Sequence, residues 1–119
     1  MSDKWQALDT FWNRFNIPAY DENTVPQNAV FPYITYEASI GDFDNNVALT
    51  ASVWYRSTSW QDVSQKVNQI SEYIGSGASA KYTNGRIWIT KENPFAQRMN
   101  DPSDDMIRRI VLQVKAEYH

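Results

Sequence analysis

Residues 47–56 read Val-Ala-Leu-Thr-Ala-Ser-Val-Trp-Tyr-Arg, and this stretch decides the fold. Every second residue is apolar, which is the period of a β-strand with one face on a core. The residues that would face the core are Val47, Leu49, Ala51, Val53 and Tyr55. The other face mixes small polar residues with Trp54 and Arg56. We therefore expect one strand of a sheet that buries a single face.

Neighbouring segments repeat the same period. Residues 31–40 place Ile34, Tyr36, Ala38 and Ile40 on one side, and the short polar turn 41–46 favours an antiparallel pair with 47–56. Residues 107–118 place Ile110, Leu112, Val114 and Ala116 on one side. Asn84-Gly85 is typical of a two-residue hairpin turn between 81–83 and 86–90, where Ile87 and Ile89 face one way.

Two segments have the helical period. Residues 3–15 place four large apolar residues at spacings of three, four and three, after a possible cap at Ser2. These residues are Trp5, Leu8, Trp12 and Phe15. Residues 60–74 carry a stripe formed by Val63, Val67, Ile70 and Ile74, between a cap at Ser59 and Gly75. Segments 17–30 and 92–105 are rich in proline and polar residues, so we expect an irregular segment and a mobile loop.

These elements predict an α+β fold. A mostly antiparallel four-stranded sheet, supplemented by the short hairpin, carries both helices on one face and buries every apolar stripe. The length of 119 residues suits a single domain over 1–119.

Composition excludes several classes of protein. The chain has no cysteine, so disulfides and thiolate chemistry are excluded. No apolar run approaches the roughly 18 residues that would predict a membrane span. Acids outnumber Lys and Arg by 14 to 11, and the cations are dispersed, which disfavours direct sequence-specific binding of nucleic acid.

Candidate catalytic residues are few. The one histidine, His119, ends the sequence as given, where chains are usually mobile, so it is a poor general base. Asp101, Asp104 and Asp105 are consistent with a cation site, but a solvated loop is the better interpretation because a hard cation needs about six oxygen ligands. We expect no enzyme activity, no cofactor and no metal.

Aromatic residues offer a stronger indication. Tyr33, Trp54 and Trp88 fall on strand faces opposite the aliphatic stripes. Either another layer or a loop covers them, or they pack on one another, or they form a protein-binding surface, where Trp and Tyr are enriched. The hypothesis is that they form an interface together with the acidic loop residues Asp101, Asp104 and Asp105.

Two further segments carry a family resemblance. Ile17-Pro18-Ala19-Tyr20, followed by residues 31–36 with the sequence Phe-Pro-Tyr-Ile-Thr-Tyr, resembles the tail terminator, or tail-completion, family of long-tailed bacteriophages, also described as head–tail joining or minor capsid proteins. The resemblance extends over nearly the whole chain, including Trp54-Tyr55-Arg56 and the closing acidic loop and strand.

The resemblance implies a structural virion protein. It would form a homo-oligomeric ring, commonly a hexamer, that caps the head-proximal end of the tail tube. Its partners would be other copies of itself, the major tail tube protein and a head connector or completion protein, and its place would be the head–tail junction of the virion after assembly in the host cytoplasm.

Other functions stay open on the residues alone. The chain is also consistent with another phage head–tail connector or tail protein, because related small folds serve several such roles. From different classes, a small non-catalytic protein-binding domain and an enzyme with a carboxylate-based site remain as alternatives.

Overall fold

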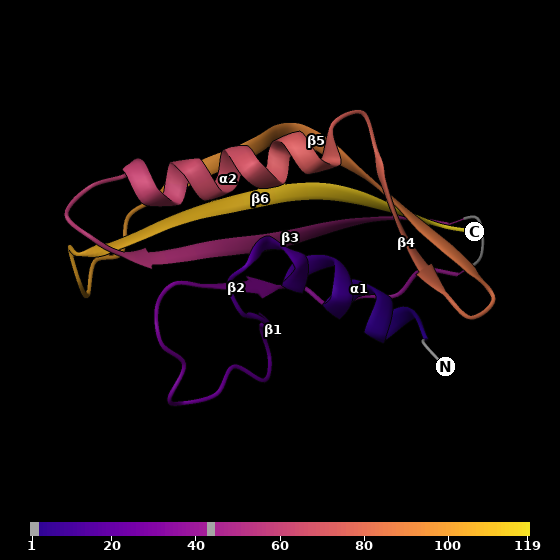
Figure 1. The fold of residues 1–119 in the computed structure, drawn as a ribbon, viewed down its shortest axis with the longest axis horizontal. Coiled ribbons are helices and arrows are strands. Elements are labelled where there is room, and N and C mark those ends of the chain that lie inside the picture. The colour runs from indigo at the N-terminus through magenta and orange to yellow at the C-terminus, as the bar shows by residue number, and fades with distance from the viewer. Residues whose placement is uncertain (1–2, 43–44) are drawn as a thin grey trace.

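The computed structural model describes residues 3–42 and 45–119, which form two α-helices, a short 3-10 helix and one six-stranded sheet (Figure 1). The helices are α1 (Lys4–Trp12), η1 (Asn13–Phe15) and α2 (Gln61–Ile74). The strands are β1 (Ala19–Asp21), β2 (Tyr33–Tyr36), β3 (Asn46–Arg56), β4 (Ala78–Tyr82), β5 (Gly85–Met99) and β6 (Ile107–Tyr118). Their order in the sheet is β1-β2-β3-β6-β5-β4.

The four-stranded, mostly antiparallel sheet expected from the sequence is wrong, although the α+β class agrees with the structure. The sheet is mixed, because β1 pairs in parallel with β2 while the other neighbours are antiparallel. The segment 17–30 was expected to be irregular, yet it supplies β1. Three residues are too few to show an alternation, so no sequence period marks this strand.

The outer edge of β1 is closed by a side chain. The Asn13 amide nitrogen donates to the Ala19 carbonyl at 3.2 Å, and the Ala19 N–H donates to the Asn13 amide oxygen at 2.9 Å. One side chain thus replaces the missing neighbour strand at this residue, and a short edge strand becomes stable.

β3 and β6 form the centre of the sheet and pair along their full lengths, from Asn46 opposite Glu117 to Arg56 opposite Ile107. Leu49, Val53 and Leu112 are buried, as the alternation predicts. The stripe of α2 lies against the same apolar face, and its four expected residues are all buried.

The sheet curves into a half-barrel around α1, which contacts both edge strands, β1 and β4 (Figure 1). The buried residues of the two helices and the inward residues of the strands belong to one apolar cluster. Within residues 3–42 and 45–119, no helix lies on the opposite face of the sheet, so its side chains determine what this face can bind.

The expected stripe of the first helix is wrong at Trp5, which is 54% exposed, while Phe11 is fully buried. A neighbouring stripe fits the helical period equally well, and it contains Leu8, Phe11 and Phe15. Asp3 caps α1 by accepting the Gln6 N–H at 2.9 Å, and Gln6 accepts the Asp3 N–H in return. The cap expected at Ser2 lies outside the described residues.

The start of α2 and the turn of the β4–β5 hairpin each differ by one residue from the expectation. The N-cap position of α2 is Trp60, although the Ser59 hydroxyl still accepts the Gln61 N–H at 3.0 Å. In the β4–β5 hairpin, Tyr82 pairs with Gly85, so Thr83 and Asn84 form the turn instead of Asn84-Gly85.

The loop expected over 92–105 is wrong for its first half, because β5 continues to Met99 and pairs with β6. The register shifts between Lys91 and Ala96, and this irregularity includes Pro94. A proline and a break in alternation conceal a strand from sequence analysis. The connecting segment is therefore only residues 100–106.

Candidate assembly surface

The face of the sheet opposite the helices, here called the outer face, carries the three aromatic residues expected there. Tyr33 lies opposite Trp54 across β2 and β3, and Trp54 lies opposite Arg109 on β6. Trp88, however, lies opposite Glu117 on β6. Glu117 lies eight positions after Arg109 on β6, which corresponds to roughly 27 Å along a strand. The structure thus unites Tyr33 with Trp54 and separates both from Trp88.

The Trp54 side chain is held by contacts with Tyr33, Thr35 and Arg109. Its ring stacks on Tyr33 with centroids 6.2 Å apart and an interplanar angle of 22°. The Arg109 guanidinium lies over the ring at 4.5 Å and also donates from Nε to the hydroxyl of buried Ser52 at 3.0 Å. The indole N–H donates to the Thr35 hydroxyl at 2.9 Å. These contacts fix the orientation of the indole before any partner arrives.

The aromatic cluster continues beyond Trp54. Tyr33 contacts Tyr20, at 6.0 Å between centroids, and Phe31, at 5.2 Å. Burial raises the pKa of Tyr33, with a smaller contribution from Tyr20, so the phenol stays protonated and can donate a hydrogen bond. A hollow of about 320 Å³ lies here, large enough for one side chain of a partner. Its lining includes Glu22, Val25, Tyr33, Trp54 and Arg109.

Trp88 lies in a different environment and is 37% exposed. Its ring packs against Gly77, where an added Cβ would come within 2.0 Å of the Trp88 ring. Gly77 has a φ of 155°, a conformation that favours glycine. Part of the Trp88 ring is therefore covered by its own chain.

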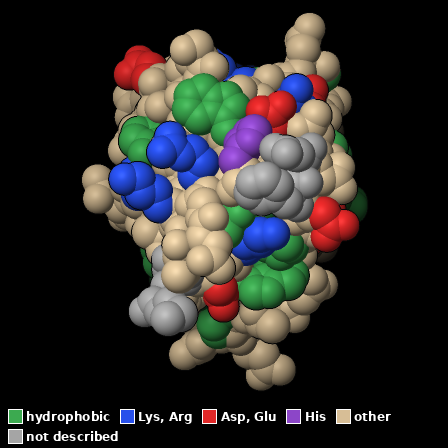
Figure 2. All heavy atoms as spheres, turned by 90° about the vertical axis from the view of Figure 1, so that its right-hand side faces the viewer, with side chains coloured by type: hydrophobic (Ala, Val, Ile, Leu, Met, Phe, Trp, Pro, Cys, Tyr) green, Lys and Arg blue, Asp and Glu red, His purple; other side chains and the backbone are tan. Residues whose placement is uncertain are grey.

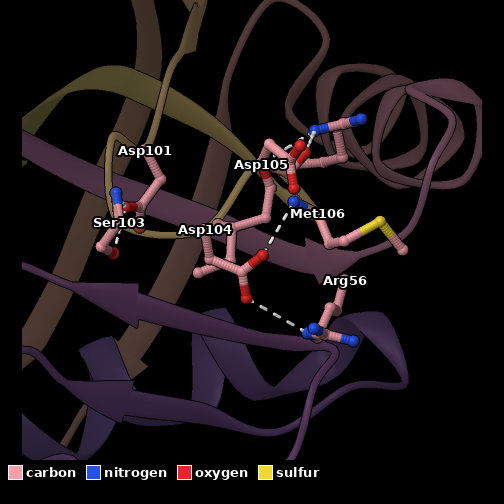
Figure 3. A network of polar contacts seen from close by, with 8 residues as sticks. Arg56, Asp101, Ser103, Asp104, Asp105 and Met106 are labelled. Carbon is pink, nitrogen blue, oxygen red and sulfur yellow. Dashed lines mark hydrogen bonds and ion pairs between the residues drawn. The ribbon is translucent and has the colours of Figure 1, made fainter.

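The three acids of the 100–106 segment have separate local roles (Figure 3). The Asp101 carboxylate accepts from the Ser103 hydroxyl and N–H, and these bonds lower its pKa. Asp104 accepts from the Met106 N–H at 2.9 Å and pairs with Arg56 at 3.3 Å. In residues 3–42 and 45–119, no group of three or more His, Cys, Asp or Glu could hold a metal ion.

Asp105 participates through its backbone. Its carbonyl accepts from the Arg108 guanidinium, which also donates to the Thr58 carbonyl at 3.2 Å. These bonds tie the 100–106 segment to the residues that precede α2. The three acids thus stabilise the turn through these local contacts.

Sequence analysis missed two features. Trp60 contacts two guanidinium groups, with Arg98 at 4.9 Å and Arg108 at 5.4 Å from its ring centroid. Nothing in the sequence pairs these residues, because they come from a helix end and two strands. Trp5 was expected in the core; its exposure was concealed because two apolar stripes overlap on α1.

None of the described helices has the length and apolar character needed to cross a membrane. No protein-family model and no curated protein matches the chain. The structure, however, is similar to a chain in a solved structure described as the virion of a native gene transfer agent particle. The TM-score is 0.62 at 18% sequence identity, over 83% of this chain and 76% of that chain. The chain therefore shares its fold with a protein of that particle.

Proposed function

We propose that the protein is a structural component of a phage-like virion and acts as a tail terminator. In this proposal a homo-oligomeric ring, of six copies by analogy with the tail terminator family, caps the head-proximal end of the tail tube and helps to join tail and head. The partners are the major tail tube protein and a head connector or completion protein, and the location is the head–tail junction.

The observation that carries this proposal is the shared fold. Most of the chain superimposes on a chain of a gene transfer agent particle. The resemblance of residues 17–20 and 31–36 to tail terminators points in the same direction. At 18% identity the shared fold does not define the role, so the capping function rests on both observations together.

The outer face supports a role in binding proteins. It presents preorganised aromatic rings and an arginine, the residue types that dominate interface energies. The cluster around Trp54 has a polar surrounding that includes Thr35 and Thr50, as expected for an interface with a wet rim. We propose a non-catalytic function for the same reason: the specialised features of this face are suited to contact.

A second candidate is a different head–tail connector. The fold similarity favours it equally, because the matched structure is described only as a virion particle. Gene order separates the two: we expect a terminator gene directly before the major tail protein gene.

Solution mass tests the ring. The purified protein is expected to form a closed oligomer by mass measurement, and rings by electron microscopy, alone or on addition of tail tubes. Protein that stays monomeric in both conditions and does not bind tube ends would contradict the proposed function.

A further inference from the structure

Two cations lie directly opposite one another near the tip of the β4–β5 hairpin. Lys81 on β4 pairs in register with Arg86 on β5. Both are exposed, and both lie on the outer face because Ala80 and Ile87 are buried. Like charges opposite each other across two strands destabilise a sheet. The ion pairs found among the described residues are Arg56–Asp104 and Glu117–His119. Neither of them includes Lys81 or Arg86.

Figure 2 views the molecule from the end where the termini and the β4–β5 turn lie. Basic side chains on this side lie among hydrophobic and acidic ones. In a chain with a net charge of −3, an exposed pair of cations is a local exception. Such a pair is stabilised when an anionic surface covers it.

An acidic, aromatic hollow lies beside α1 and β1. It has a volume of about 370 Å³ and contains two carboxylates, from Asp9 and Asp21. Asp9 accepts from the Tyr36 hydroxyl at 2.8 Å, and Asp21 accepts from the Asn23 N–H at 2.9 Å. Neither carboxylate has an ion pair with a cation in the described part of the chain.

Both carboxylates of this hollow influence the pKa of the Tyr36 hydroxyl. Burial raises its pKa most, and the Asp9 hydrogen bond and the charges of Asp9 and Asp21 raise it further. Trp5 and Tyr20 also line the hollow, and Trp5 is mostly exposed. An exposed indole beside two carboxylates suits an ammonium or guanidinium group, which both the ring face and the acids attract.

We infer that the Lys81–Arg86 pair of one copy docks into the Asp9–Asp21 hollow of a second copy. The inference rests on the proposed self-association and identifies the two surfaces that meet. Two cations face two carboxylates, so charge is matched locally although the copies repel each other as wholes. Because the two surfaces differ, the contact is suited to head-to-tail assembly, which closes into a ring when the rotation permits.

Charge exchange tests this contact. Lys81→Glu and Asp21→Lys each place like charges at the contact, so each alone should weaken self-association by about tenfold or more. An equimolar mixture should recover association, because every contact in an alternating assembly then joins opposite charges. Lys91→Glu is the matched control, since Lys91 is exposed on the helix side of β5, where its ammonium donates to the Ser71 hydroxyl of α2, and the charge change is identical.

The measurement is the dissociation constant by analytical ultracentrifugation at low and high salt, with thermal unfolding of each variant to verify folding. Recovery in the mixture, with Lys91→Glu near wild type, supports the inference. It is overturned if the mixture does not recover, if Lys91→Glu weakens association as strongly, or if wild type never self-associates. If Lys81→Glu and Asp21→Lys each form rings as well as the wild type does, this contact is rejected, but the tail-capping proposal still stands.

Discussion

The two faces of one sheet use the same alternation for opposite purposes. Inward residues such as Leu112 and Val114 are fully buried under the helices, while their neighbours Gln113 and Lys115 remain partly exposed on the outer face. The inner face gains free energy by removing apolar area from water. The outer face instead holds aromatic and charged groups at defined positions. One face is therefore devoted to stability, and we propose that the other serves recognition.

The outer face is itself divided. Trp54 is fixed by Tyr33, Thr35 and Arg109, whereas Trp88 lies over Gly77. Both tryptophans share a strand phase, but their surroundings differ. The alternation along a strand therefore identifies which residues face outward. It does not reveal which of these residues contact one another.

The largest expected effect is on the inner face. Leu112→Ala should lower the free energy of unfolding by about 2–5 kcal/mol, because it leaves a cavity beneath α2. Gln113→Ala, one residue along on the outer face, should change it by no more than about 0.5 kcal/mol. Urea unfolding of both variants measures the contrast, and equal effects would remove the distinction between the faces.

The second effect concerns association. Trp54→Ser and Trp88→Ser should each weaken self-association or tail joining by about 2 kcal/mol if a partner covers the ring. Their melting temperatures should fall less than that of Leu112→Ala, because the helix-covered core is untouched. Thermal unfolding and assembly are measured on the same samples. A large fall in melting temperature with normal assembly would assign these residues to stability alone.

A third effect appears at alkaline pH. Burial raises the pKa of Tyr118 to about 12, and its hydroxyl donates to the Ser39 carbonyl at 2.8 Å. The unfolded chain ionises this group near pH 10, so the stability it contributes is present below about pH 10 and is lost as pH rises towards 12. Tyr118→Phe should flatten the decline in urea stability between these values. An unchanged slope would show that Tyr118 does not govern it.

The smallest effect is expected at the edge of the outer face. Arg56 and Asp104 form an ion pair at 3.3 Å, and Arg56 is about half exposed. Exposed pairs contribute about 0–1 kcal/mol, so Arg56→Ala should cost at most about 1 kcal/mol. A double-mutant cycle with Asp104→Ala measures the coupling. A coupling well above 1 kcal/mol would show that this pair anchors the 100–106 segment.

Sequence analysis succeeded where a period is long and uninterrupted. The stripes of α2, β3 and β6 repeat over eleven or more residues, and the structure confirms their buried phase. It failed where tertiary contacts decide. β1 depends on Asn13 and on parallel pairing with β2, and the second half of β5 depends on β6 across a break in register.

The candidate site shows the same division. Alternation placed Tyr33, Trp54 and Trp88 on the outer face, but only pairing across β2, β3 and β6 shows that Trp54 meets Tyr33 and Arg109. The acidic residues were identified as a group, yet they act as separate turn contacts. The hollow beside Trp5 was missed because the sequence assigned that tryptophan to the core.

The length distribution of tail tubes tests the central claim most directly. The cognate tube protein is polymerised with and without this protein, and tubes are measured by electron microscopy. The proposed function predicts that added protein halts growth, shortens the tubes and appears as a ring at one end only. Tubes of unchanged length without a ring at either end would contradict the account.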